Sequence, residues 1–232
     1  MFRSDKLSYS EQLDRVERAM RSWDSTMSTS TQTFSALANV SARREVDSAA
    51  PSRVVDDAAS ARDTADDSAA ERALTQHDRA RGRTLENAAK LESYSNGLRR
   101  VLDVLRGLVD EMVAASDAAT LLYAKTVRAQ LKGAAEDAVA EARNRVRSEA
   151  IHRGSREASV LDVVEALQAV AAAYEREYWV KWRIVERALD YGRPQDMDGL
   201  LQAWAEDTQI AREELRGAVR RAKGVSARLS VD

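Results

Sequence analysis

Three basic side chains, those of Lys125, Arg128 and Lys132, recur at spacings of three and four residues in a predicted helix. Such spacings place all three on one side of the helix, and residues 124–135 contain no acidic side chain. A stripe of this kind can bind the phosphates of an anionic membrane, where each cation contributes about 1 kcal/mol. The pattern is equally consistent with a solvated helix face whose cations form ordinary ion pairs within the protein.

A second group of cations surrounds a turn that we predict at Ile151–Ser155, where Gly154 favours a helix C-terminus and Ser155 a helix N-cap. Five arginines oppose only two glutamates across residues 143–157. A guanidinium can engage two phosphate oxygens at once, so we expect this tip to contact a membrane. Its arginines are Arg143, Arg145, Arg147, Arg153 and Arg156.

The remaining chemistry-bearing residues argue against an enzyme. The chain has no cysteine and two histidines, His77 and His152, and neither has a second ligand at metal spacing. No phosphate-binding glycine loop or nucleophile motif occurs, so we expect no catalytic residue, no metal and no cofactor. The net charge of −2 excludes a generally basic nucleic-acid binder.

The C-terminal segment is also basic, and its cations are interpreted as complementing the dipole at a helix C-terminus. They are Arg212, Arg216, Arg220, Arg221, Lys223 and Arg228.

The elements that must position these cations are long helices. With 9 glycines and 2 prolines in 232 residues, the chain has few helix breakers, and apolar residues recur at spacings of three and four. We predict an all-α fold of three antiparallel helices in a single domain over residues 1–232. The helices cover about 8–70, 71–150 and 156–228.

Ser8 and Glu11 have the spacing of a capping box at the N-terminus of the first helix. Pro51 predicts a kink or break in the first helix, and Gly192–Pro194 an interruption of the third.

The stretch 44–73 is rich in Ala, Ser and acidic residues and has almost no large apolar side chain. Two interpretations remain open for it: a disordered acidic linker, or a helix of low stability.

The apolar seams of three such long helices would be poorly covered within one chain, so we expect a dimer. Trp179 and Trp182 are interpreted as core or dimer-interface residues. The residues expected at or near the interface are Trp23, Met27, Phe34, Leu98, Leu102, Leu105 and Trp204.

Motifs in each helix resemble the BAR half of the PX-BAR sorting nexins. The first helix has a phenylalanine–small–small–leucine step, the second a glutamine and an aspartate before a leucine–tyrosine pair, and the third an alternation of aromatic and charged residues. The residues concerned are Phe34–Leu37, Gln76, Asp78, Leu91, Tyr94, Leu98, Val101, Leu102, Tyr174–Tyr178, Val185, Arg187, Tyr191, Leu201, Trp204 and Glu206. The resemblance covers about residues 9–222, although the 44–73 stretch is poorer in large apolar side chains than the family's first helix.

This resemblance implies a curved BAR-type bundle completed by dimerisation, which senses or remodels membrane curvature in endosomal sorting. It further implies a homodimer, or a heterodimer with a related BAR protein, a phosphoinositide-containing membrane and a retromer-type coat as partners. The implied location is cytoplasmic and peripheral on endosomal membranes, and we expect no PX domain in this chain. The alternative function is a cytosolic coiled-coil scaffold or adaptor that joins proteins without binding membranes.

Overall fold

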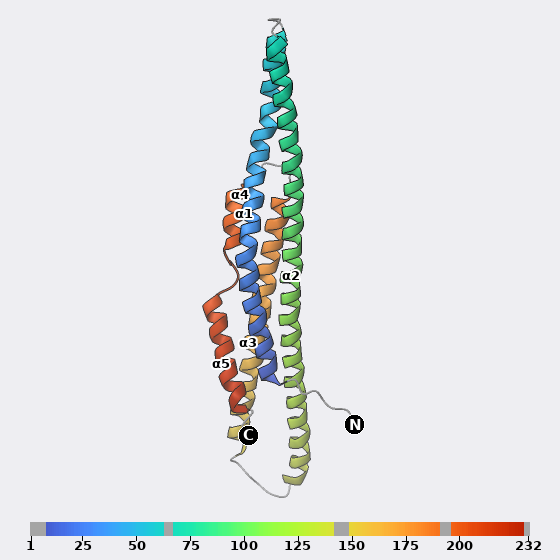
Figure 1. Cartoon of the computed structure of the whole chain (residues 1–232). Helices are drawn as coiled ribbons and strands as arrows, with labels where there is room; N and C mark the ends of the chain where they lie inside the picture. The colour runs from blue at the N-terminus through green and yellow to red at the C-terminus, as the bar shows by residue number, and fades with distance from the viewer. Residues whose placement is uncertain (1–7, 63–66, 142–148, 191–195, 230–232) are drawn as a thin grey trace. The chain divides into compact units, whose positions relative to one another are not determined.

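A computed structural model describes residues 8–62, 67–141, 149–190 and 196–229. Within these ranges it leaves out the side chains of 45–74, 76, 77, 80, 134–141, 149–159 and 229. The described residues form helices and connecting segments without a strand, so the fold is all-α, as predicted. The helices are α1 (Tyr9–Arg62), α2 (Asp67–Glu141), α3 (Glu149–Ala188), α4 (Met197–Ala205) and α5 (Arg212–Leu229) (Figure 1).

The start of α1 confirms the predicted capping box. The backbone N–H of Ser8 donates to the Glu11 carboxylate at 2.6 Å, and the backbone N–H of Glu11 donates to the Ser8 hydroxyl at 3.3 Å. This reciprocal pair satisfies two N–H groups that have no partner within the helix, and it fixes where α1 begins.

Of the kink or break predicted at Pro51, the break is wrong, because α1 continues through Pro51 to Arg62, and the kink stays a prediction. Of the two interpretations of the 44–73 stretch, the structure has the helix over 44–62, followed by α2 from Asp67. The alanines and charged residues after Pro51 are compatible with a helix, and they offset the hydrogen bond that proline removes.

The boundaries of the third predicted helix also differ. Residues 151–155 lie inside α3, which begins at Glu149, so Gly154 and Ser155 do not form the predicted turn. The interruption near Pro194 is confirmed, since α3 ends at Ala188 and α4 begins at Met197. A further interruption, which the sequence did not predict, separates α4 from α5.

The chain divides into two units rather than the single predicted domain, and α1, α2 and α3 contribute to both. Unit 1 comprises residues 1–26, 104–182 and 207–232, and unit 2 comprises residues 27–103 and 183–206. In unit 1 the core includes Trp23, whose ring meets Tyr174 edge to face at 5.2 Å. Successive helices of unit 1 run in opposite directions (Figure 1). The side-chain amide of Gln168 in α3 donates to the Thr120 hydroxyl of α2 at 3.3 Å.

Unit 2 is built around Phe34, whose ring stacks on Trp204 of α4 with ring centroids 5.4 Å apart. Helices α1 and α2 approach closely here, because a Cβ atom on Gly97 would lie only 3.3 Å from the Thr33 methyl group. A side chain at position 97 would therefore require the Thr33 methyl group to shift by a few tenths of an ångström.

The seven residues expected at a dimer interface are all buried within the chain itself. Trp23 and Leu105 lie in the core of unit 1, and the other five lie in unit 2. Their own chain already covers them, so these side chains no longer argue for a partner, and dimerisation stays a prediction. The five in unit 2 are Met27, Phe34, Leu98, Leu102 and Trp204.

Candidate functional site

The basic stripe of α2, defined as Lys125, Arg128 and Lys132, is exposed along its whole length in unit 1. None of the three forms an ion pair or hydrogen bond with the part of the chain that the structure describes. Two large apolar side chains lie beside them in sequence, Leu121 at 62% exposed and Leu131 at 66%. Leu121 is four residues before Lys125, so it falls in line with the stripe. Cations and leucines together form an amphipathic surface whose cations have no described counter-ion.

The arginines of the predicted tip are not brought into this surface by any described contact. Arg143, Arg145 and Arg147 lie outside the described residues. Arg153 and Arg156 belong to α3, but their side chains also lie outside the description. The interpretation of the tip as a membrane contact therefore stays a prediction.

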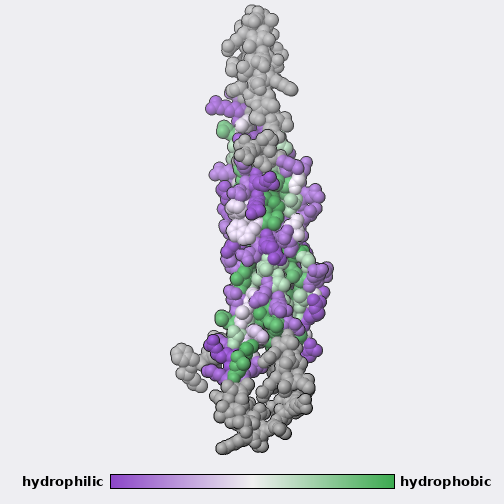
Figure 2. Space-filling model, turned by 180° about the vertical axis from the view of Figure 1, so that it is seen from behind, coloured by the Kyte–Doolittle hydropathy of each residue, from purple (hydrophilic) through white to green (hydrophobic). Residues whose placement is uncertain are grey.

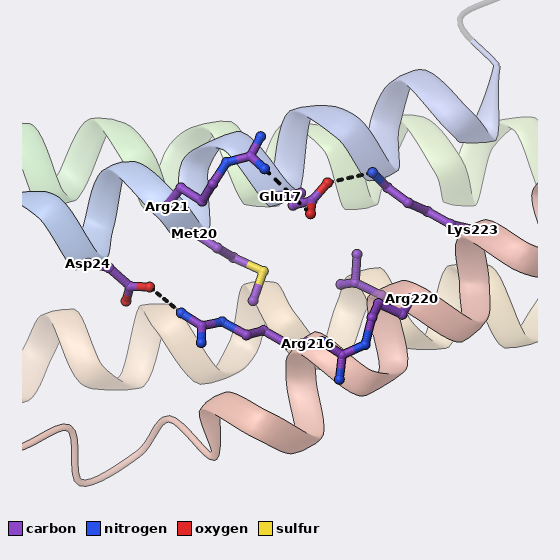
Figure 3. A pocket seen from close by; sticks show the side chains of 8 residues that line it. Glu17, Met20, Arg21, Asp24, Arg216, Arg220 and Lys223 are labelled. Atoms are coloured by element: carbon purple, nitrogen blue, oxygen red, sulfur yellow. Dashed lines mark hydrogen bonds and ion pairs between the residues drawn. The ribbon is translucent and has the colours of Figure 1, made fainter.

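Unit 1 has a groove between α1 and α5, the α1–α5 groove, of about 280 Å³ (Figure 3). Buried Met20 and Val219 form its apolar part. Its charged lining residues are Glu17, Arg21, Asp24, Arg216, Arg220 and Lys223. Most of these charges are neutralised by pairing across the groove or along α1, as the dashed lines in Figure 3 show.

One end of the α1–α5 groove is closed by Lys223. Its ammonium lies 2.6 Å from the Asp14 carboxylate and 2.5 Å from that of Glu17. The hydrogen bond from Lys223 lowers the pKa of both carboxyl groups below their usual values, and the same two hydrogen bonds raise the pKa of Lys223. These shifts have one physical cause, which is that each charged form is stabilised by its partner.

The other end is closed by Asp24, which pairs with Arg212 at 3.2 Å and with Arg216 at 2.5 Å. Arg212 also donates to Asp207, in the segment between α4 and α5. Beneath this network Tyr174 is buried, and burial, followed by the negative charge of Asp24, raises its pKa. Two arginines and two aspartates thus fix the beginning of α5 to α1.

A buried ion pair also holds the segment between α4 and α5 in place. The Lys181 ammonium is 0% exposed and lies 2.9 Å from the Glu177 carboxylate and 3.8 Å from that of Asp207. Glu177 also accepts hydrogen bonds from the backbone N–H of Gln209 at 2.7 Å and from the hydroxyl of Thr208 at 3.4 Å. Buried charges are tolerated when they are paired and hydrogen-bonded in this way. These contacts hold the segment between α4 and α5 against α3.

Three of the C-terminal cations were interpreted as complementing the dipole at a helix C-terminus, but ion pairs with α1 account for them instead. Arg212 and Arg216 lie in the first turns of α5, where the helix dipole disfavours positive charge, and acidic side chains of α1 account for them instead. Lys223 is likewise paired with α1. The sequence did contain a signal for these ion pairs. The acids Asp14, Glu17 and Asp24 of α1 are separated by three and seven residues, and the cations Arg212, Arg216 and Lys223 of α5 by four and seven. Spacing alone, however, does not identify which helix pairs with which.

The exposed side of α3 in unit 1 carries the aromatic pair Trp179 and Trp182, which are 46% and 37% exposed. Their rings meet edge to face at 5.9 Å, and Trp179 also meets Tyr178 at 5.3 Å. The interpretation of these two tryptophans as core is therefore wrong, because the core positions here are taken by Tyr174 and Tyr178. Figure 2, which shows the molecule from behind, has apolar side chains interrupting a mostly hydrophilic surface.

Comparison of this chain with models of protein families, with curated proteins and with solved structures gave no match. Within the described ranges, no helix has both the length and the apolar character needed to cross a bilayer. Among the same residues, no three His, Asp or Glu side chains are grouped so that they could hold a metal ion.

Proposed function

We propose that this chain is a helical module that binds anionic membrane surfaces through the basic stripe and acts as a dimer in the manner of a BAR domain. The observation that carries the proposal is the exposure of Lys125, Arg128 and Lys132 without a described counter-ion. Some other cations of unit 1, such as Lys223 and Arg216, are paired with carboxylates. Arg176 and Arg220, like the stripe, have no described counter-ion. Cations without a described counter-ion are those most available to an external anion.

The two exposed leucines beside the stripe support a membrane rather than another polyanion. An amphipathic helix surface binds bilayers by placing cations at the headgroups and apolar side chains at the acyl boundary. Leu121 and Leu131 are the apolar residues that such a surface requires, and a nucleic-acid backbone would leave them exposed to water. Curvature sensing and a role in endosomal sorting come only from the sequence resemblance and belong to the same proposal.

Reversing the three charges tests it. In Lys125→Glu/Arg128→Glu/Lys132→Glu, we expect loss of about 3 kcal/mol of binding to vesicles rich in anionic lipid, a weakening of roughly 100-fold at low salt. Vesicle co-sedimentation measures the change, and the helicity of the variant by circular dichroism should match the parent because all three positions are exposed.

The matched control reverses three exposed arginines of α2 outside the stripe, as Arg83→Glu/Arg99→Glu/Arg100→Glu, with the same change in net charge. It should bind nearly as well as the parent. Equal weakening of both variants would reduce the effect to net charge. A parent that does not pellet with anionic vesicles would favour the cytosolic scaffold.

A further inference from the structure

Between Ala169 and Trp182, the exposed face of α3 has a flat half followed by a bulky half. Trp179 and Trp182 project from the C-terminal half, whereas the corresponding exposed positions two to three turns earlier are Ala169 and Ala172. Ala169, Ala172, Arg176 and Trp179 follow one another at spacings of three, four and three, so they share one side of the helix. On such a surface the two large side chains are not covered by their own chain, and the two small ones leave room for a large side chain of another molecule.

Two oppositely charged residues occupy the middle of this face. Glu175 and Arg176 are both exposed, and neither forms an ion pair or hydrogen bond with another residue of the described ranges. They are adjacent in sequence and therefore point about 100° apart around the helix, so they cannot neutralise each other well. Each has a charge without a described partner at the boundary between the bulky half and the flat half.

We propose that this face of α3 is a self-complementary contact surface that binds a second copy of the chain in antiparallel orientation. A two-fold axis between positions 175 and 176 places Trp179 against the partner's Ala172 and Trp182 against the partner's Ala169. The same axis places Glu175 opposite the partner's Arg176, and Arg176 opposite the partner's Glu175. A two-fold interface uses the same patch on both subunits, so one patch must supply both members of every contact. Positions 169, 172, 175, 176, 179 and 182 do so, whereas the same axis places the exposed Glu165 opposite the partner's Glu186.

A second copy accounts for these features better than an unrelated protein. Large side chains, small side chains and both signs of charge lie on one face at positions symmetric about a single point, and a different partner gives no reason for that symmetry. The inference rests on the dimer in the proposed function and deepens it, because it names a surface distinct from the seven buried residues first expected there.

Charge exchange tests the contact without disturbing the fold, since both positions are exposed. In Glu175→Arg each subunit presents two arginines to the partner, and in Arg176→Glu each presents two glutamates. We expect the dimer dissociation constant of either variant, measured by analytical ultracentrifugation, to rise at least about tenfold, because like charges are brought together. The double variant Glu175→Arg/Arg176→Glu should return to within about threefold of the parent.

An equimolar mixture of the two single variants provides the sharpest result. Each arginine of one subunit then meets a glutamate of the other, so the mixture should form heterodimers that neither variant forms alone. A change in the fold of one subunit would not be repaired by mixing. A structural role for either residue is thereby separated from a role in the contact.

The aromatic half is tested by Trp179→Ala, which should weaken the dimer at least about tenfold. The control Leu85→Ala, at an exposed leucine of unit 2, should leave it unchanged. A parent that is monomeric up to about 100 μM, or single charge variants that dimerise as the parent does, would overturn the inference. Vesicle binding distinguishes failure of the dimer inference from failure of the membrane proposal. A monomer that still pellets with anionic vesicles retains the membrane proposal, and a dimer that does not pellet retains the dimer inference.

Discussion

The two short helices that follow α3 are attached to the molecule by different forces. Helix α4 is held in unit 2 by Trp204, which is fully buried, stacks on Phe34 and donates from its ring N–H to the Ser30 hydroxyl at 3.2 Å. Helix α5 is held in unit 1 by ion pairs from Asp24 and Lys223, and by the smaller buried side chains of Val219, Ala222 and Ser226. One helix is fixed by a single large aromatic side chain, and the other by ion pairs together with small buried side chains.

This difference determines which solution conditions affect each helix. Burial of an aromatic ring is nearly independent of salt and pH, whereas ion pairs at a partly exposed surface are screened by salt and lost when a partner is neutralised. Helix α4 should therefore remain attached wherever unit 2 is folded. Helix α5 should detach under conditions in which the rest of unit 1 is still folded.

The largest effect is expected from Trp204→Ala. Removing a fully buried tryptophan leaves a cavity beside Phe34, and we expect the free energy of unfolding of unit 2 to fall by about 3–5 kcal/mol. Urea denaturation followed by hydrogen exchange of peptides from α4 measures the change. The loss should be similar at low and high salt. A loss that shrinks strongly with added salt would show that charge, not apolar burial, holds α4.

A smaller effect is expected from Asp24→Asn, which removes the charge that pairs with Arg212 and Arg216. We expect the attachment of α5 to weaken by about 1–2 kcal/mol, since the pairs are partly exposed. Faster amide exchange across α5, with unchanged exchange in α4, is the signature, and about 1 M salt should reduce the difference between variant and parent.

The control for this change is Glu86→Gln, which removes an exposed carboxylate paired with Lys90 four residues away on the same helix. It should leave exchange in α5 unchanged. Equal exchange of α5 in the parent and in Asp24→Asn would mean that the ion pairs of Asp24 contribute nothing to the attachment.

The smallest effect is a pH dependence confined to α5. The pKa values of Asp14 and Glu17 are lowered by Lys223, so their contribution is present above their usual values of 3.8 and 4.5 and is lost as pH falls through the lower folded values. The pKa of Lys223 is raised above its usual 10.5, so its contribution is lost as pH rises through that higher value. Amide protection of α5 relative to α4 should therefore be greatest between about pH 5 and 10. Lys223→Met should flatten this profile, and an unchanged profile in that variant would contradict the assignment.

Several features were determined by sequence because they depend on residues close together in the chain. The all-α class follows from the scarcity of glycine and proline, the start of α1 from Ser8 and Glu11, and the interruption before α4 from Pro194. Each rests on backbone preferences or hydrogen bonds within one turn, which hold whatever the rest of the chain does. The exposure of the basic stripe also followed from local pattern, since its positions lie off the apolar seam.

Only the tertiary structure decided which helix covers which. The heptad seams of α1, α2 and α3 predicted apolar contacts but not their partners, so Trp23 and Phe34 were assigned to a second chain when Tyr174 and Trp204 of the same chain already cover them. The role of the α5 cations depended on acids nearly two hundred residues away, as Asp24 and Arg216 show, and no local spacing specifies such a pairing. Trp179 and Trp182 were exposed for the same reason: a helix has more than one side on which residues three and four apart can align, and packing with distant helices selects the side that is buried.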